Sequence, residues 1–325
     1  MKSVVEDIKK GSFKPVYLFY GEEAYLKQQY KNRLKNAVLP EGDTINLSIY
    51  SGKGIDVKEM IAQADTMPFF AEHRLLLIED SGFFKNANQQ LAEYIPSIPE
   101  ETIILFVESE VDKRGKLYKA VSKKGSVVEF TAQNEQTLTR WILGILKTEG
   151  KMITSGAMKQ FLEKTGTDME RIRQELEKLI CYCMEKESIT EKDVAVICSE
   201  QTENKIFDMI NAMAEKKQKK AMELYYDLLA LKEPPMRILY LITRQFNLLM
   251  QVKELSEEGY SAKTISERLK MAGFIVRNCL RQAEYFSLKT LKEALQDCVR
   301  MEEAVKTGRM NDVMSVELLL VKYSS

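Results

Sequence analysis

Histidine is nearly absent from this chain of 325 residues, because His73 is its only one. An enzyme of the Ser–His–Asp or Cys–His type would have to use that single residue as its base. The cysteines are Cys181, Cys183, Cys198, Cys279 and Cys298. They include no C-x-x-C pair and lack the spacing of a zinc site, so we expect reduced, buried thiols. The sequence therefore predicts no catalytic residues and no metal site.

Long apolar runs and an excess of one charge are also missing. No apolar stretch reaches the roughly 18–20 residues that cross a bilayer. The first residues include Glu6 and Asp7, where a signal peptide needs an apolar segment. Lys plus Arg and Asp plus Glu both number 48, so no global field attracts nucleic acid. These absences predict a cytoplasmic protein without a membrane partner.

Short apolar runs that alternate with helical segments fill the first part of the chain. The runs are 15–20, 45–50, 75–78, 102–107 and 126–130. Most are apolar over successive residues rather than alternating, which is typical of strands covered on both faces of a mostly parallel sheet. We expect residues 1–133 to form an α/β domain on five strands.

The rest of the chain has helical periodicity, and no strand is expected after Asn134. A small all-α domain is predicted at 134–200, with helices at 135–148 and 155–164. Another helix follows a capping box in which Thr167 caps and Glu170 closes the box. A second all-α domain is predicted at 201–325, with helices at 205–216, 219–232, 235–257, 261–269, 274–285, 288–307 and 312–322. The third of these is apolar over much of its circumference, so it lies centrally or at a subunit interface.

A degenerate phosphate-binding loop follows the first apolar run. The motif G-x-x-x-x-G-K-[ST] would cradle phosphates with backbone N–H groups and hold magnesium through its hydroxyl. Gly21 and Lys27 are in register, but Leu26 replaces the second glycine and Gln28 replaces the hydroxyl. Two glutamates follow Gly21 and would repel a polyphosphate, at a cost on the order of 1–4 kcal/mol. We expect that this loop does not bind ATP and that the chain has no cofactor.

Charged residues at three other places each have two interpretations. Glu79 and Asp80 end the third run, where such a fold would hold magnesium, but we favour a solvated strand end. The basic segments 113–116 and 216–220 are either solvated turns or contacts to DNA phosphates. For the two basic segments the sequence leaves both interpretations open.

A short apolar segment, Met67, Pro68, Phe69 and Phe70, precedes the third run and is called the wedge below. Pro68 disfavours continuation of the preceding helix. The two rings either anchor a loop in the core or form an exposed hydrophobic element that inserts into another protein.

Several stretches taken together resemble one family. They are 15–23 (PVYLFYGEE), 67–70 (MPFF), 166–168 (GTD), 175–179 (ELEKL), 189–194 (ITEKDV), 244–246 (RQF) and 306–308 (KTG). In this order they resemble the delta subunit of the bacterial DNA polymerase III clamp loader. The resemblance implies an AAA+-like α/β domain, a helical lid and a helical collar domain, without a working nucleotide site. It also implies that Phe69 and Phe70 bind the sliding clamp, although an aliphatic–aromatic pair is common in the family.

The function implied by the resemblance is that of a non-hydrolysing subunit that opens the clamp for loading onto primed DNA. Its partners would be the sliding clamp, the ATPase subunits of a hetero-oligomeric ring, and primer–template DNA through the assembled complex. Two alternatives stay open from the sequence: an active AAA+ ATPase, and a stand-alone DNA-binding helical protein that uses 216–220.

Overall fold

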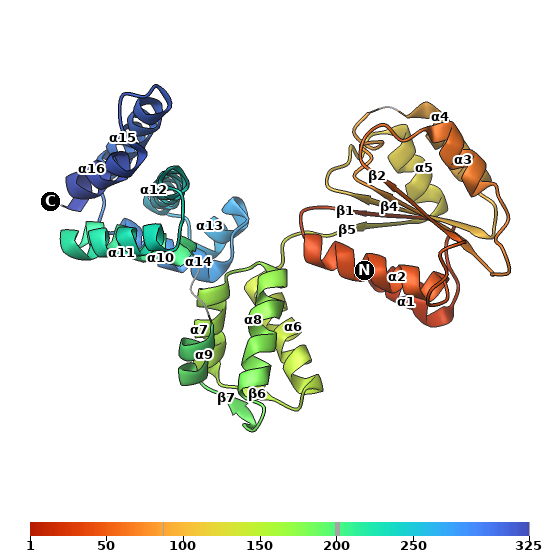
Figure 1. Cartoon of the computed structure of the whole chain (residues 1–325), viewed down its shortest axis with the longest axis horizontal. Coiled ribbons are helices and arrows are strands. Elements are labelled where there is room, and N and C mark those ends of the chain that lie inside the picture. The colour runs from red at the N-terminus through yellow and green to blue at the C-terminus, as the bar shows by residue number, and fades with distance from the viewer. Residues whose placement is uncertain (87, 199–201, 325) are drawn as a thin grey trace. The chain divides into compact units, whose positions relative to one another are not determined.

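The computed structural model describes residues 1–86, 88–198 and 202–324. It divides into two compact units, Met1–Gln133 and Asn134–Ser325 (Figure 1). The further division of the second unit near residue 200 stays a prediction.

The first unit contains a sheet of five parallel strands in the order β2-β3-β4-β1-β5. The strands are β1 Val16–Tyr20, β2 Leu47–Ser51, β3 Arg74–Glu79, β4 Thr102–Glu108 and β5 Ser126–Glu129. Each corresponds to one of the predicted apolar runs, so the prediction of an α/β domain with a parallel sheet is confirmed.

Helices cover both faces of this sheet (Figure 1). The helices are α1 Lys2–Lys10, α2 Ala24–Val38, α3 Val57–Ala64, α4 Gln89–Tyr94 with the short 3₁₀ turn Ile95–Ser97, and α5 Lys116–Lys124. Successive residues of a strand point to opposite faces, so Tyr17 and Phe19 pack with α1 and α2 while Leu18 and Tyr20 pack with α3, α4 and α5. The continuous apolar pattern of β1 follows from this double cover. The sequence did not predict α1, whose only buried residue is Val4.

The second unit begins with α6 Glu135–Thr148, α7 Ser155–Thr165, α8 Met169–Tyr182 and α9 Glu191–Ile197. Two parallel strands of two residues, β6 Met152–Ile153 and β7 Ser188–Ile189, also occur here. The expectation of no strand after Asn134 is therefore wrong, because strands this short leave no periodic pattern in the sequence.

The predicted capping box at the start of α8 is also wrong. Asp168, not Thr167, is the N-cap, and its carboxylate accepts a hydrogen bond of 2.9 Å from the Arg171 backbone N–H. Aspartate and threonine are both good N-caps, so the sequence does not decide between adjacent positions. A capping box does occur at α9, where Thr190 and Asp193 bond each other's backbone groups.

Over the described residues 202–324 the second unit contains seven further helices, which confirms the helical character predicted for this part of the chain. They are α10 Thr202–Ala214, α11 Gln218–Ala230, α12 Pro235–Glu257, α13 Ala262–Leu269, α14 Gly273–Ala283, α15 Leu288–Lys306 and α16 Asp312–Ser324. Helix α12 contacts α10, α13, α14, α15 and α16. Its apolar circumference is thus used within this bundle. Four of the cysteines are buried as expected, whereas Cys181 is exposed, contrary to expectation.

Candidate functional site

The wedge lies on the surface of the first unit, in the segment between α3 and β3. The exposed fraction of the residue is 96% for Phe70, 77% for Met67 and 57% for Phe69. The two phenylalanine rings contact each other edge to face, with their centroids 4.6 Å apart. The rings therefore do not anchor the loop in the core. Their binding to another protein stays a prediction.

A buried asparagine holds the backbone beneath these rings. The side chain of Asn46, which is only 2% exposed, accepts a hydrogen bond of 2.6 Å from the Phe69 N–H. Its Nδ2 donates to the Phe69 carbonyl at 3.0 Å and to the Asp43 carboxylate at 2.8 Å. The hydrogen bonds from Asn46 lower the pKa of Asp43. Since an ionised carboxylate only accepts, Asp43 fixes which way the amide points.

Arg74 holds the other end of the wedge. Its guanidinium donates to the Met67 carbonyl at 3.4 Å, and the residue is only 4% exposed. Neither Asn46 nor Arg74 was predicted from the sequence. The one available signal was a polar residue, Asn46, inside a run expected to be a strand, where asparagine is disfavoured.

The degenerate phosphate loop is short and closed. Helix α2 begins at Ala24, so only three residues connect it to β1. The N–H of Glu23 donates to the Phe130 carbonyl at 3.1 Å. A Cβ atom on Gly21 would come within 2.3 Å of the same oxygen. The segment therefore packs directly against the end of β5, and Leu26 packs against the core under α1 and α2.

The lysine of this loop is also occupied. The Lys27 ammonium donates to the Glu108 carbonyl at 3.1 Å, and burial lowers its pKa. The carboxylate of Glu108 accepts hydrogen bonds from the Ser81 hydroxyl and from the backbone N–H groups of Ser81 and Gly82. Burial raises the pKa of this carboxyl group. Gln28, in the position of the metal-binding hydroxyl, bonds Asn32 on the helix surface.

The two acidic residues at the end of β3 have different environments. Glu79 forms an ion pair of 2.6 Å with Lys31 of α2 and is partly buried, so the interpretation as a solvated strand end is wrong for it. Asp80 is exposed, as that interpretation requires, and accepts a hydrogen bond of 2.8 Å from the Ser109 hydroxyl.

Both basic segments pair with acidic side chains of their own unit. Lys113 lies 2.8 Å from Glu129, and Arg114 lies 3.1 Å from Asp112. In 216–220, Lys217 lies 2.6 Å from Glu215 and Lys219 lies 3.9 Å from Glu223. These pairs reduce the local positive field and favour solvated turns over a DNA-binding patch.

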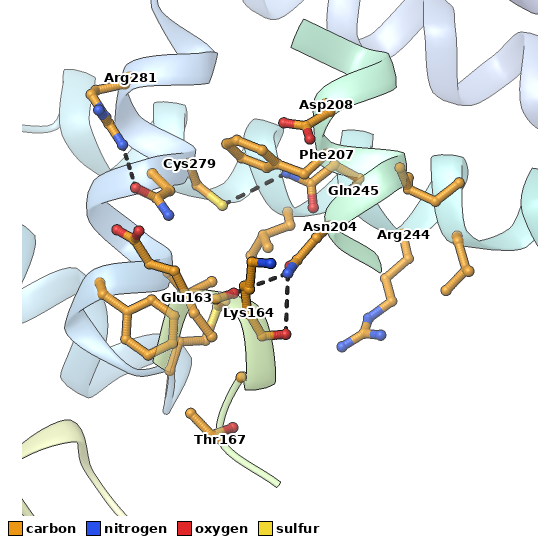
Figure 2. Close-up of a pocket in the computed structure, with 18 of the residues that line it drawn as sticks. Glu163, Lys164, Thr167, Asn204, Phe207, Asp208, Arg244, Gln245, Cys279 and Arg281 are labelled. Atoms are coloured by element: carbon orange, nitrogen blue, oxygen red, sulfur yellow. Dashed lines mark hydrogen bonds between the residues drawn. The ribbon is translucent and has the colours of Figure 1, made fainter. Parts of the chain in front are cut away.

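A cavity of about 660 Å³ lies in the second unit, among α7, α10, α12, α14 and the segment after α7 (Figure 2). It brings together Gly166, Thr167 and Asp168 with Arg244 and Gln245, which belong to two of the stretches that carry the family resemblance. Most polar groups that Figure 2 labels bond within the unit. Asn204, for example, donates to the carbonyls of Glu163 and Lys164. Cationic and acidic side chains are mixed on its walls, so the cavity does not favour one class of ligand.

Two absences concern only the parts of the chain that the structure describes. Within 1–86, 88–198 and 202–324, no helix is both long and apolar enough to cross a membrane. Over the same ranges, no three acidic, histidine or cysteine side chains gather as a metal site would require.

Comparisons with known proteins agree with one another. Residues 17–131 match the family model described as DNA polymerase III, delta subunit, and residues 203–323 match the model of its C-terminal domain. The DNA polymerase III subunit delta of Bacillus subtilis is 30% identical, over 98% of this chain and 95% of that protein. The solved DNA clamp loader delta protein of Bacillus subtilis superposes with a TM-score of 0.70, at 30% identity and with 99% of each chain covered. The chain therefore belongs to the delta subunit family of the bacterial DNA polymerase III clamp loader.

Proposed function

We propose that this chain binds a sliding clamp through the wedge and holds the clamp open for loading onto primed DNA. The observation that supports this most directly is the exposure of Phe69 and Phe70 on a hydrogen-bonded loop. Burying two phenylalanines contributes roughly 3–6 kcal/mol in gross terms. Association entropy offsets much of that, so Met67 and Pro68 contribute further apolar contact.

The opening step follows from differential binding. A ligand shifts an equilibrium only by its difference in affinity for the two states. A chain that binds the open clamp more tightly than the closed clamp therefore shifts the clamp towards the open state without hydrolysing ATP. The short segment after β1 and the ion pair of Lys31 with Glu79 support a non-hydrolysing role.

The partners in this proposal are the clamp and the ATPase subunits of a hetero-oligomeric ring in the cytoplasm. Those ATPase neighbours control when the wedge is exposed. Primer–template DNA is bound by the assembled complex rather than by this chain alone, in agreement with the paired lysines of 113–116 and 216–220.

The test is clamp binding by the Phe69→Ala/Phe70→Ala double variant, measured by surface plasmon resonance on immobilised clamp. We expect at least about 100-fold weaker binding, which corresponds to about 2.7 kcal/mol. A matched control is Tyr240→Ala/Tyr285→Ala, which removes two exposed aromatic rings from the second unit. Undiminished binding by a folded double variant of the wedge would contradict the proposal.

A further inference from the structure

We propose that Asn46 is a positioning residue that sets the wedge in its binding shape before the clamp arrives. This inference rests on the proposed function. Asn46 itself is buried and does not belong to the contact surface, so its effect on binding is indirect.

The first support is the geometry of the amide. Asn46 both accepts from the Phe69 N–H and donates to the Phe69 carbonyl, so it occupies both backbone groups of one wedge residue. The Asp43 carboxylate accepts from the Asn46 Nδ2 and from the Asn46 backbone N–H. The order Asp43, Asn46, Phe69 is thus a chain of hydrogen bonds with one possible direction.

The second support is that the wedge cannot hold this shape by its own packing. Phe70 has a φ of 50°, in the left-handed region that is unfavourable for a residue with a Cβ atom. Its ring is almost fully exposed, so it gains little from burial in the free chain. Strained conformations persist only where the surrounding structure determines them. The buried groups that contact this loop, Asn46 and Arg74, supply that determination.

The consequence for binding is kinetic. If only a fraction of molecules has the competent wedge, the apparent dissociation constant rises by the inverse of that fraction. Loss of the Asn46 amide lowers this fraction and slows association. Once the clamp is bound, the same rings are buried, so dissociation is unchanged. Removal of a ring has the opposite signature, because it accelerates dissociation.

The experiment compares Asn46→Ala and Asn46→Asp with Phe70→Ala, using the full chain and immobilised clamp. For both Asn46 variants we expect association to be about tenfold slower. Their dissociation rate constants should stay near that of the unmodified chain. Asn46→Asp is informative because its carboxylate can still accept from the Phe69 N–H but cannot donate to the carbonyl and faces Asp43. For Phe70→Ala we expect mainly faster dissociation.

A second readout does not need the clamp. Hydrogen exchange measured by NMR reports the protection of the Phe69 amide directly. Among the described residues, that N–H donates a hydrogen bond only to the Asn46 side chain. We expect it to lose protection in both Asn46 variants, while amides of the sheet such as Leu76 and Ile104 keep theirs. The matched control is Asn88→Ala, which removes another asparagine side-chain hydrogen bond of the first unit, to the Leu91 N–H at the start of α4.

The outcomes separate the two proposals. If Phe69→Ala/Phe70→Ala leaves clamp binding intact, the proposed function is wrong, whatever Asn46 does. If Phe70→Ala weakens binding but the Asn46 variants associate at the normal rate, the wedge is right and the positioning role is wrong. A slower association that Asn88→Ala reproduces would also overturn the positioning role, because it would show a general loss of stability.

Discussion

Lys31 and Glu79 form an ion pair of 2.6 Å that joins α2 to the carboxyl end of β3. In open parallel sheets, ligands bind at the carboxyl ends of the strands. Here the protein's own lysine neutralises the acidic residue that would serve a metal ion. Lys27, nearby in α2, bonds the Glu108 carbonyl instead of a phosphate. The charged groups of this edge are therefore used within the fold.

The first prediction concerns nucleotide binding by the isolated chain. Calorimetric titration with a non-hydrolysable ATP analogue and magnesium should give no heat above the dilution background. The Gly21 segment is closed against Phe130, Lys27 bonds the Glu108 carbonyl, and Lys31 is paired with Glu79. The melting temperature should likewise not respond, whereas a ligand at 100 times its dissociation constant would add about 2.7 kcal/mol. Stoichiometric binding would instead support the active AAA+ ATPase.

A second prediction concerns Gly21→Ala. Gly21 has a φ of 118°, and an added Cβ would lie 2.3 Å from the Phe130 carbonyl oxygen. The backbone must then move apart where β1 and β5 end. We expect the free energy of unfolding of the first unit to fall by about 3 kcal/mol. Hydrogen exchange of peptides within residues 1–133 measures this loss of stability.

The matched control for this variant is Gly42→Ala. Gly42 also has a positive φ, of 84°, but a Cβ there would meet nothing within 4 Å. We expect a loss of only about 1 kcal/mol from the backbone conformation. Equal losses in the two variants would show that the close approach to Phe130 does not matter.

The sheet and most helices could be predicted from sequence because their signal is local. Each central strand is buried on both faces and is therefore a continuous apolar run. The support of the wedge could not be predicted, because Asn46 meets Phe69 only after 23 residues of chain have folded back. The choice between Thr167 and Asp168 as the N-cap also depends on the path of the preceding chain. Sequence pattern and family resemblance thus pointed to Phe69 and Phe70 as candidates, whereas tertiary structure was needed to find the hydrogen bonds that Asn46 makes with Phe69.

A third prediction concerns the pH dependence of the second unit. Asp193 accepts hydrogen bonds from the Thr190 N–H and hydroxyl and lies 2.5 Å from the Lys186 ammonium. These contacts lower its pKa from 3.8 to about 2, with Lys186 as the largest cause. A lowered folded-state pKa contributes stability that is present above pH 4 and is lost as the pH falls towards 2.

Asp193→Asn keeps an oxygen that can accept from the Thr190 N–H but loses the charge that pairs with Lys186, so it should lower the free energy of unfolding at pH 7 by about 1 kcal/mol. The difference from the unmodified chain should shrink between pH 4 and pH 2. Urea unfolding followed by the fluorescence of Trp141, the single tryptophan of the chain, measures this in the second unit. A difference that stays constant down to pH 2 would show that the carboxylate charge is not involved.

The last prediction concerns Gln282, a buried amide that links three helices of the second unit. Its Nε2 donates to the Phe207 carbonyl at 2.9 Å and to the Asn211 side chain at 2.7 Å, both on α10. Its Oε1 accepts from Gln245 of α12 at 2.7 Å. Gln282→Leu keeps much of the volume but removes all three bonds. Because a buried polar group without a partner costs about 1–3 kcal/mol, we expect a total loss of roughly 2–4 kcal/mol.

The control for this prediction is Gln251→Leu on the same helix α12 that carries Gln245. Gln251 bonds Asn247 at 3.2 Å on the exposed side of that helix, where water replaces a lost partner. Its substitution should change the free energy of unfolding by no more than about 0.5 kcal/mol. The two variants remove the same chemical group, so their difference isolates burial. If Gln282→Leu unfolds at the same urea concentration as Gln251→Leu, then packing around α12 holds the bundle without the amide network, and the helices are joined by apolar contact alone.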